Sequence, residues 1–83
     1  MNKVSAEIIS ANCIYIQTSE GVYLQSFDTI IACITSKGET ILDKKYWNYS
    51  SSTSNHRNKF LRETSAETAK KLASGVYKLA NLN

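Results

Sequence analysis

The pattern of hydrophobic and polar positions divides the chain into a first part typical of strands and a second part typical of helices. Five short runs in the first part alternate or are rich in β-branched and aromatic residues, which indicates strands. They cover residues 4–8, 13–17, 22–27, 29–35 and 40–42. Turn residues separate them, with Gly21 and Gly38 the clearest. The pattern predicts an antiparallel sheet of four to five short strands over residues 3–43.

The serine-rich stretch after the sheet predicts the start of a short helix. Thr53 or Ser54 is a suitable N-cap, because a hydroxyl there can accept a hydrogen bond from a backbone N–H one turn later. His56, Lys59 and Phe60 then follow at helical spacing. We expect this helix at about residues 54–62.

A second and longer helix is expected at about residues 65–80. Thr64 and Glu67 have the spacing of a capping box, which marks its start. Apolar residues continue from Ala66 to Ala80 at helical period, with Gly75 among them. A sheet covered on one face by two helices is an α+β fold, and the 83 residues predict a single domain over residues 1–83.

Composition narrows the class of protein without indicating an activity. Hydrophobic residues make up 42% and charged residues 20%, as in an ordinary folded domain. The chain has no apolar run near the roughly 20 residues of a membrane span, and its N-terminus lacks the apolar core of a secretory signal. We therefore expect a cytoplasmic protein without membrane contact. Cys13 and Cys33 lie in apolar runs, which favours buried free thiols over a disulfide.

The charge is unevenly distributed along the chain. The net charge is +3, but residues 1–42 sum to −2 and residues 43–83 to +5. A basic half favours a partner that carries negative charge.

Two segments resemble a family of small phage and prophage proteins. The family pattern is a Ser-aromatic-x-Thr strand opening, a hairpin, and a Tyr-Ser-x-x-Thr-x-x-His-x-x-x-Phe-Leu segment. The matching residues are Ser26, Phe27, Thr29, Tyr49, Ser50, Thr53, His56, Phe60 and Leu61. The resemblance covers about residues 23–61. It implies a mobile-element origin, and because the members are largely uncharacterised it implies no particular activity.

Catalytic chemistry finds little support in the sequence. His56 is the only histidine, and the nearby hydroxyls of Ser52 and Thr53 lack a glycine-rich elbow or a suitably placed acid. We expect His56 to bond a backbone carbonyl or a cap hydroxyl instead. The carboxylates are scattered, and two isolated cysteines with one distant histidine do not have the spacing of a zinc site. No catalytic residue, metal ligand or cofactor is predicted, and we expect no enzyme.

The strongest candidate for binding is a set of cations and aromatic rings around the start of the first helix. Its members are Lys44, Lys45, Trp47, Tyr49, His56, Arg57, Lys59 and Arg62. Rings that stack on bases and cations that pair with phosphates are typical of single-stranded nucleic-acid binding. The same residue types are common hot spots of protein interfaces, so the alternative is a phage-encoded inhibitor of a host protein such as a defence nuclease. A structural interpretation is also open, in which Trp47 seals the sheet edge and the cations are solvated. A homodimer is compatible with the small residues of the second helix.

Overall fold

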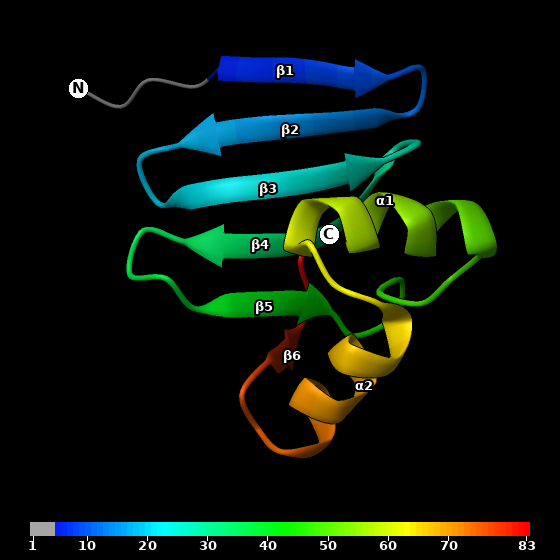
Figure 1. The fold of residues 1–83 in the computed structure, drawn as a ribbon. Helices are drawn as coiled ribbons and strands as arrows, with labels where there is room; N and C mark the ends of the chain where they lie inside the picture. Colours follow the sequence, from blue (N-terminus) through cyan, green and yellow to red (C-terminus); the bar gives the residue numbers. More distant parts are fainter. Residues whose placement is uncertain (1–4) are drawn as a thin grey trace.

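A six-stranded sheet and two helices make up the part of the chain that the computed structural model describes, residues 5–83. The strands are β1 (Ser5–Ser10), β2 (Cys13–Thr18), β3 (Gly21–Ser26), β4 (Thr29–Thr35), β5 (Thr40–Asp43) and β6 (Lys78–Ala80). The helices α1 (Ser51–Leu61) and α2 (Ser65–Ala73) connect β5 to β6 (Figure 1). The predicted α+β fold is confirmed. The beginning of the first predicted strand, at residues 3–4, lies outside the described residues.

The strands lie in the sheet in the order of the sequence, from β1 to β6. The first five form an antiparallel meander, because each is joined to the next by a short turn. β6 pairs with β5 in parallel, which is possible because both helices lie in the connection between them. The sheet therefore has one strand more than predicted.

One face of the sheet carries the main core. The register places Tyr15, Leu24, Ala32 and Leu42 side by side on this face, and the last three are fully buried. α1 lies across β3 and β4, with the ring of Phe60 5.0 Å from that of Tyr15 in an edge-on contact. The same cluster is also contacted by the side chains of Trp47, Leu61, Leu72 and Tyr77. Both helices thus contribute to the same face.

α1 begins earlier than the sequence pattern indicated. Its N-cap is Ser50, whose hydroxyl accepts a hydrogen bond from the backbone N–H of Thr53 at 3.1 Å. Thr53, one of the two predicted caps, points into the core with 2% of its surface exposed. Several consecutive hydroxyl residues can serve as a cap, and the packing of Thr53 determines which one does. The predicted N-caps Thr53 and Ser54 are therefore wrong.

α2 begins as predicted and ends early. Thr64 and Glu67 form the predicted capping box, with hydrogen bonds in both directions. The helix stops at Ala73, and Gly75 takes a φ of +83°, a conformation that ends helices. The residues after it leave the helical path and form β6 beside β5, so the predicted helix to about residue 80 is wrong. Pairing with an open sheet edge outweighs the local helical pattern.

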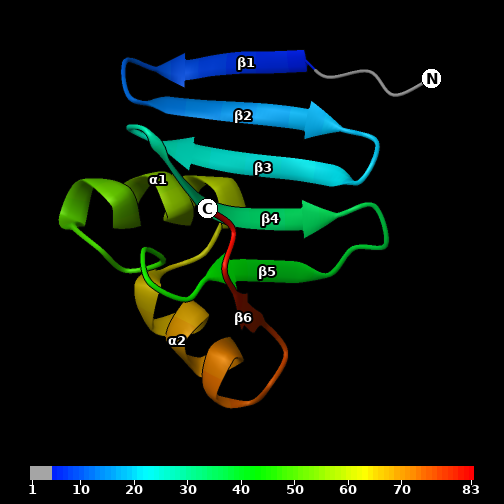
Figure 2. The same cartoon turned by 180° about the vertical axis from the view of Figure 1, so that it is seen from behind.

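No helix from residues 5–83 covers the other face of the sheet. Figure 2 shows the strands from behind, with the C-terminal segment crossing the ends of β5 and β4. This segment is held by hydrogen bonds from the backbone N–H of Leu82 to Asp43 and between the side chain of Asn83 and the backbone of Ile30.

Candidate binding site

A hollow of about 520 Å³ lies between the β3–β4 turn and the segment that leads from β5 into α1. Its strand side is lined by Ser26, Phe27, Asp28, Thr29 and Ile31, and its helix side by Tyr46, Tyr49, Ser50 and Thr53. The two segments that carry the sequence resemblance therefore meet at one place. They meet because α1 packs across β3 and β4.

Three polar side chains form a hydrogen-bonded cluster beneath the hollow. The hydroxyl oxygen of Ser26 lies 2.8 Å from Nδ1 of His56 and 3.3 Å from Oγ1 of Thr53. Burial lowers the pKa of His56, and the positive charge of Lys59 lowers it further, so the ring is neutral at pH 7. A neutral ring allows the Ser26 hydroxyl to donate to Nδ1. The cluster ties the end of β3 to the middle of α1.

The Ser26–His56 pair has the separation of a nucleophile and a general base, but its surroundings favour a structural role. A nucleophile must reach its substrate, and its base is normally oriented by a third group. Only 1% of Ser26 is exposed, and among residues 5–83 no carboxylate hydrogen-bonds to the ring of His56. The partner of His56 is thus neither the backbone carbonyl nor the cap hydroxyl that the helix pattern indicated, but a strand hydroxyl thirty positions earlier in the chain.

Two aromatic side chains are exposed at the rim of the hollow, one from each side. Phe27 is 48% exposed, and its ring centroid lies 6.0 Å from that of His56. Tyr49 is 70% exposed, and its ring meets that of Tyr46 edge-on at 5.5 Å. Aromatic faces open to solvent are surfaces on which a flat ligand can stack.

The backbone at Phe27 is held in a conformation that few bulky residues adopt. Its φ is +58°, and it is the first of the two turn residues between the paired residues Ser26 and Thr29. Two-residue hairpin turns require this conformation at that position, and a non-glycine residue there costs about 1–3 kcal/mol. Hydrogen bonds from Phe27 N–H to the carbonyl of Asn12 and from the Gln25 amide to the carbonyl of Phe27 secure it. The turn therefore fixes the backbone position and the Cα–Cβ direction from which the Phe27 ring extends at the rim. The sequence reasoning did not include Phe27 among the site residues, although it belongs to the turn.

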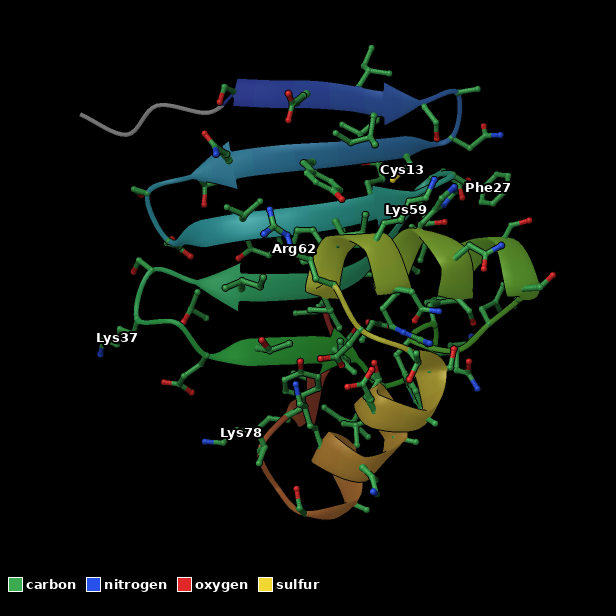
Figure 3. The ribbon with its side chains drawn as sticks, in the orientation of Figure 1. Cys13, Phe27, Lys37, Lys59, Arg62 and Lys78 are labelled. Carbon is green, nitrogen blue, oxygen red and sulfur yellow. The ribbon has the colours of Figure 1, made fainter. Side chains whose placement is uncertain are left out.

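The predicted cations separate into two groups. Lys44 and Lys45 are exposed on the segment before α1, and Nζ of Lys45 lies 5.4 Å from the ring centroid of Tyr46 in the wall of the hollow. Lys59 on α1 and Arg62, the residue that caps the C-terminus of α1, are exposed on the side that faces β2 and β3. Lys59 projects on the side where Phe27 lies (Figure 3). Arg62 lies at the far end of the helix from the hollow.

Arg57 and Trp47 belong to the interior and not to the surface patch. Arg57 is completely buried, and its guanidinium lies 5.3 Å from the ring centroid of Trp47. It donates to the carbonyl of Trp47, to the side-chain oxygens of Asn48 and Asn58, and to the hydroxyl of Ser65. Arg57 thus joins the segment before α1, α1 itself and the first residue of α2. Trp47 packs against the core, as the structural interpretation of the sequence expected.

The two cysteines are free and buried, as predicted. Burial raises the pKa of both thiols, which disfavours the reactive thiolate. Within residues 5–83, no group of three or more His, Cys, Asp or Glu side chains is arranged to hold a metal ion. No helix in this part of the chain is long and apolar enough to cross a membrane.

The fold and the hollow define the class of protein. It is a small α+β protein with a surface site that has aromatic side chains at its rim, hydroxyls in its lining and two lysines nearby. Comparison with protein families assigns the chain more narrowly. A family model described as "Family of unknown function (DUF8033)" matches residues 1–75, and the chain belongs to this family. Searches of curated proteins and of solved structures found no match.

Proposed function

We propose that this protein is a small non-enzymatic binding protein that contacts single-stranded nucleic acid at the hollow. One base would stack on the exposed rings at the rim, and the flanking phosphates would pair with the lysines before α1. The observation that supports this most strongly is the position of Phe27 and Tyr49, both exposed at the rim, next to a segment that carries Lys44 and Lys45.

The chemistry of the hollow suits a base better than a phosphate. Asp28 contributes a carboxylate to the lining, which repels phosphate but accepts hydrogen bonds from the amino groups of bases. Hydroxyls of Ser50 and Thr29 add groups that can both donate and accept. Stacking of a base on an aromatic side chain contributes about 1–3 kcal/mol and tolerates any sequence.

The two lysines are available to an anion. Neither Lys44 nor Lys45 forms an ion pair within residues 5–83, whereas Lys71 pairs with Glu63 at 2.7 Å and Lys78 with Glu39 at 3.9 Å. If both bind phosphates of a single strand, the logarithm of the binding constant should fall with the logarithm of salt concentration with a slope of about −1.4. Lys59 lies on the opposite side of the rim and could add a third contact, which would steepen the slope to about −2.

Fluorescence anisotropy with a labelled 15-nucleotide strand at low and moderate salt tests this proposal. We expect binding that weakens with salt and that is lost in the variant Lys44→Ala/Lys45→Ala. The charge-matched control is Lys37→Ala/Lys70→Ala, which removes two exposed lysines elsewhere, on the β4–β5 turn and on α2. Tyr49→Ala should weaken binding about tenfold, while Tyr49→Phe, which keeps the ring, should bind normally. Absence of binding at low salt, or equal losses in the two double variants, would refute the proposal.

The second candidate is an inhibitor from a mobile element that binds a host protein, such as a defence nuclease, in the host cytoplasm. It is favoured by the same exposed rings, because aromatic residues at a rim are typical of interface hot spots. The carboxylate of Asp28 in the lining and the exposed lysines before α1 also suit a partner protein whose surface carries both charges. If no oligonucleotide binds, capture from nuclease-treated host lysate by the wild type but not by Tyr49→Ala would support this candidate.

A further inference from the structure

The face of the sheet opposite the helices carries a row of apolar residues that crosses β1 to β5 and ends at a lysine on β6. The register places Ala6, Ile16, Tyr23, Cys33, Ile41 and Lys78 directly opposite one another from β1 to β6. A second row on the same face contains Ile8, Ile14, Gln25 and Ile30. These residues alternate along each strand with those that face the helices, so the main core does not include them.

No helix among residues 5–83 covers this face, but exposure along it is uneven. Ala6, Ile8 and Lys78 are exposed, Cys33 is buried at 3%, and the other residues of the two rows are half-buried. Both helices pack on the other side, and Figure 2 shows only the C-terminal segment crossing the face, near the end where Asn83 binds Ile30. At the β1 end the face is open, with Ile8 75% exposed. A contiguous apolar surface in a small protein is typical of an interface.

The charge on the face limits the nature of its partner. The two rows contain no carboxylate, and their single cation is Lys78 at the β6 end, beside Glu39. A nucleic acid or a strongly charged protein would find no complementary charges along β1 to β5. The partner that the face fits is one whose own surface is equally apolar and uncharged.

We propose that the partner is a second copy of this chain, packed face to face through the two apolar rows. A two-fold dimer brings the same patch of each copy together, so an uncharged face is complementary to itself. The helices of each copy would lie on the outer sides of the two sheets. Sheets pack about 10 Å apart, so the cations of α1 in the two copies would be separated by two sheets and more than the Debye length of about 8 Å. The basic halves of the two chains therefore do not oppose this association.

The energetics of a small domain also favour a second copy. A chain of 83 residues forms a limited core, and here the fully buried apolar residues on the helix face number only five in one cluster. A disulfide cannot supplement that core, because Cys13 faces the helices while Cys33 belongs to the opposite face. Association is a usual way for small domains to gain stability. The interface lies on the sheet and not on the small residues of α2, which the sequence had suggested for a dimer.

Sedimentation equilibrium on the full chain tests the proposal, over protein concentrations from about 5 to 200 µM so that a dissociating dimer is detected. We expect the wild type to approach twice the 9.3 kDa chain mass. Ile8→Lys, at a position exposed in the single copy, should raise the dimer dissociation constant at least about 100-fold, because each copy would bury an unpaired ammonium. Ile16→Lys, in the middle of the face, should act in the same way. The control is Val76→Lys, at a residue 64% exposed on the loop after α2, which should leave the dimer intact.

Far-ultraviolet circular dichroism shows whether each variant is folded. If Ile16→Lys does not fold, Ile8→Lys alone decides the question. A wild type that stays at 9.3 kDa at every concentration overturns the proposal, and so does a dimer that survives Ile8→Lys. A wild-type monomer that binds neutral phosphatidylcholine vesicles through this face would show that lipid is the partner, which also overturns it.

Discussion

Replacement of Arg57 provides the sharpest test of how the two helices are held to each other and to the segment that follows β5. Arg57 is completely buried, and its four hydrogen bonds go to uncharged acceptors. Burial lowers the pKa of the guanidinium, and the nearby charge of Glu63 opposes this shift. The side chain therefore brings a charge into the interior without a directly bonded carboxylate. Its value to the fold depends on the groups that it connects.

The expected loss follows from what each acceptor does when the guanidinium is removed. Asn48 and Ser65 are exposed residues and can bond to water instead, and Asn58 is half-buried. The carbonyl of Trp47 belongs to a residue that packs against the core, so it is the acceptor least able to find another partner. One buried acceptor left without a partner costs about 1–3 kcal/mol. Truncation to alanine also leaves a cavity, which for large side chains adds about 2 kcal/mol. We expect Arg57→Ala to lose about 3–5 kcal/mol of a total stability of about 4–12 kcal/mol for a chain of this length.

Arg57→Met separates the two contributions, because it fills most of the volume and removes the charge. It should lose about 1–3 kcal/mol, since only the unsatisfied acceptor remains. Urea unfolding measures both variants, with the fluorescence of Trp47, the only tryptophan, as a probe next to the changed site. The control is Lys59→Ala, an exposed cation on the same helix, which should stay within about 0.5 kcal/mol of the wild type. A loss for Arg57→Ala as small as that of the control would refute the reasoning.

Two further predictions concern the turn after β5 and the start of β3. Burial by itself raises the pKa of Asp43, but hydrogen bonds from the N–H groups of Leu82, Tyr46 and Lys45 and from the side chain of Asn83 outweigh it, and the pKa is lowered. The Asp43 carboxylate therefore stabilises the folded state at pH values above its unfolded pKa of about 3.9, and this contribution is lost as the pH falls through its lowered folded pKa. In urea unfolding, the stability advantage of the wild type over Asp43→Asn should shrink between about pH 5 and pH 2. An advantage that does not depend on pH would contradict this prediction. Gly21 has a φ of +149°, and a Cβ there would lie 2.3 Å from the carbonyl oxygen of Ile34. Gly21→Ala should therefore lower the midpoint of thermal unfolding more than Gly38→Ala does. In Gly38→Ala the new Cβ would meet nothing within 4 Å, so the substitution costs only about 1–2 kcal/mol of backbone strain. Equal midpoints for the two variants would contradict this prediction.

Local patterns in the sequence determined most of the secondary structure. Alternation and short runs rich in β-branched and aromatic residues predicted the first five strands, because both patterns suit an extended chain paired in a sheet. The capping box of Thr64 and Glu67 predicted the start of α2, because both hydrogen bonds lie within a few residues of each other. Signals of this kind act over one or two turns of chain. They can therefore be read without knowledge of the fold.

The candidate site could be predicted only in part. Tyr49, Lys44 and Lys45 were identified from their types, and they are exposed near the hollow. Phe27 was not, because its role depends on a turn that places it across the hollow from Tyr46 and Tyr49, which lie far along the chain. Arg57 was assigned to the surface with its neighbours, because a cation in a polar helix is usually solvated.

Contacts between segments that lie far apart in the sequence were decided only by the tertiary structure. The hydrogen bond between Ser26 and His56 spans thirty positions, and neither residue signals the other locally. Residues 78–80 continue a helical pattern but become β6, because the open edge of β5 offers backbone hydrogen bonds that an exposed helix end lacks. Likewise, alternation shows that a strand has two faces but not which face the helices cover. That choice left one apolar face of this sheet open, because two short helices suffice to cover only one side.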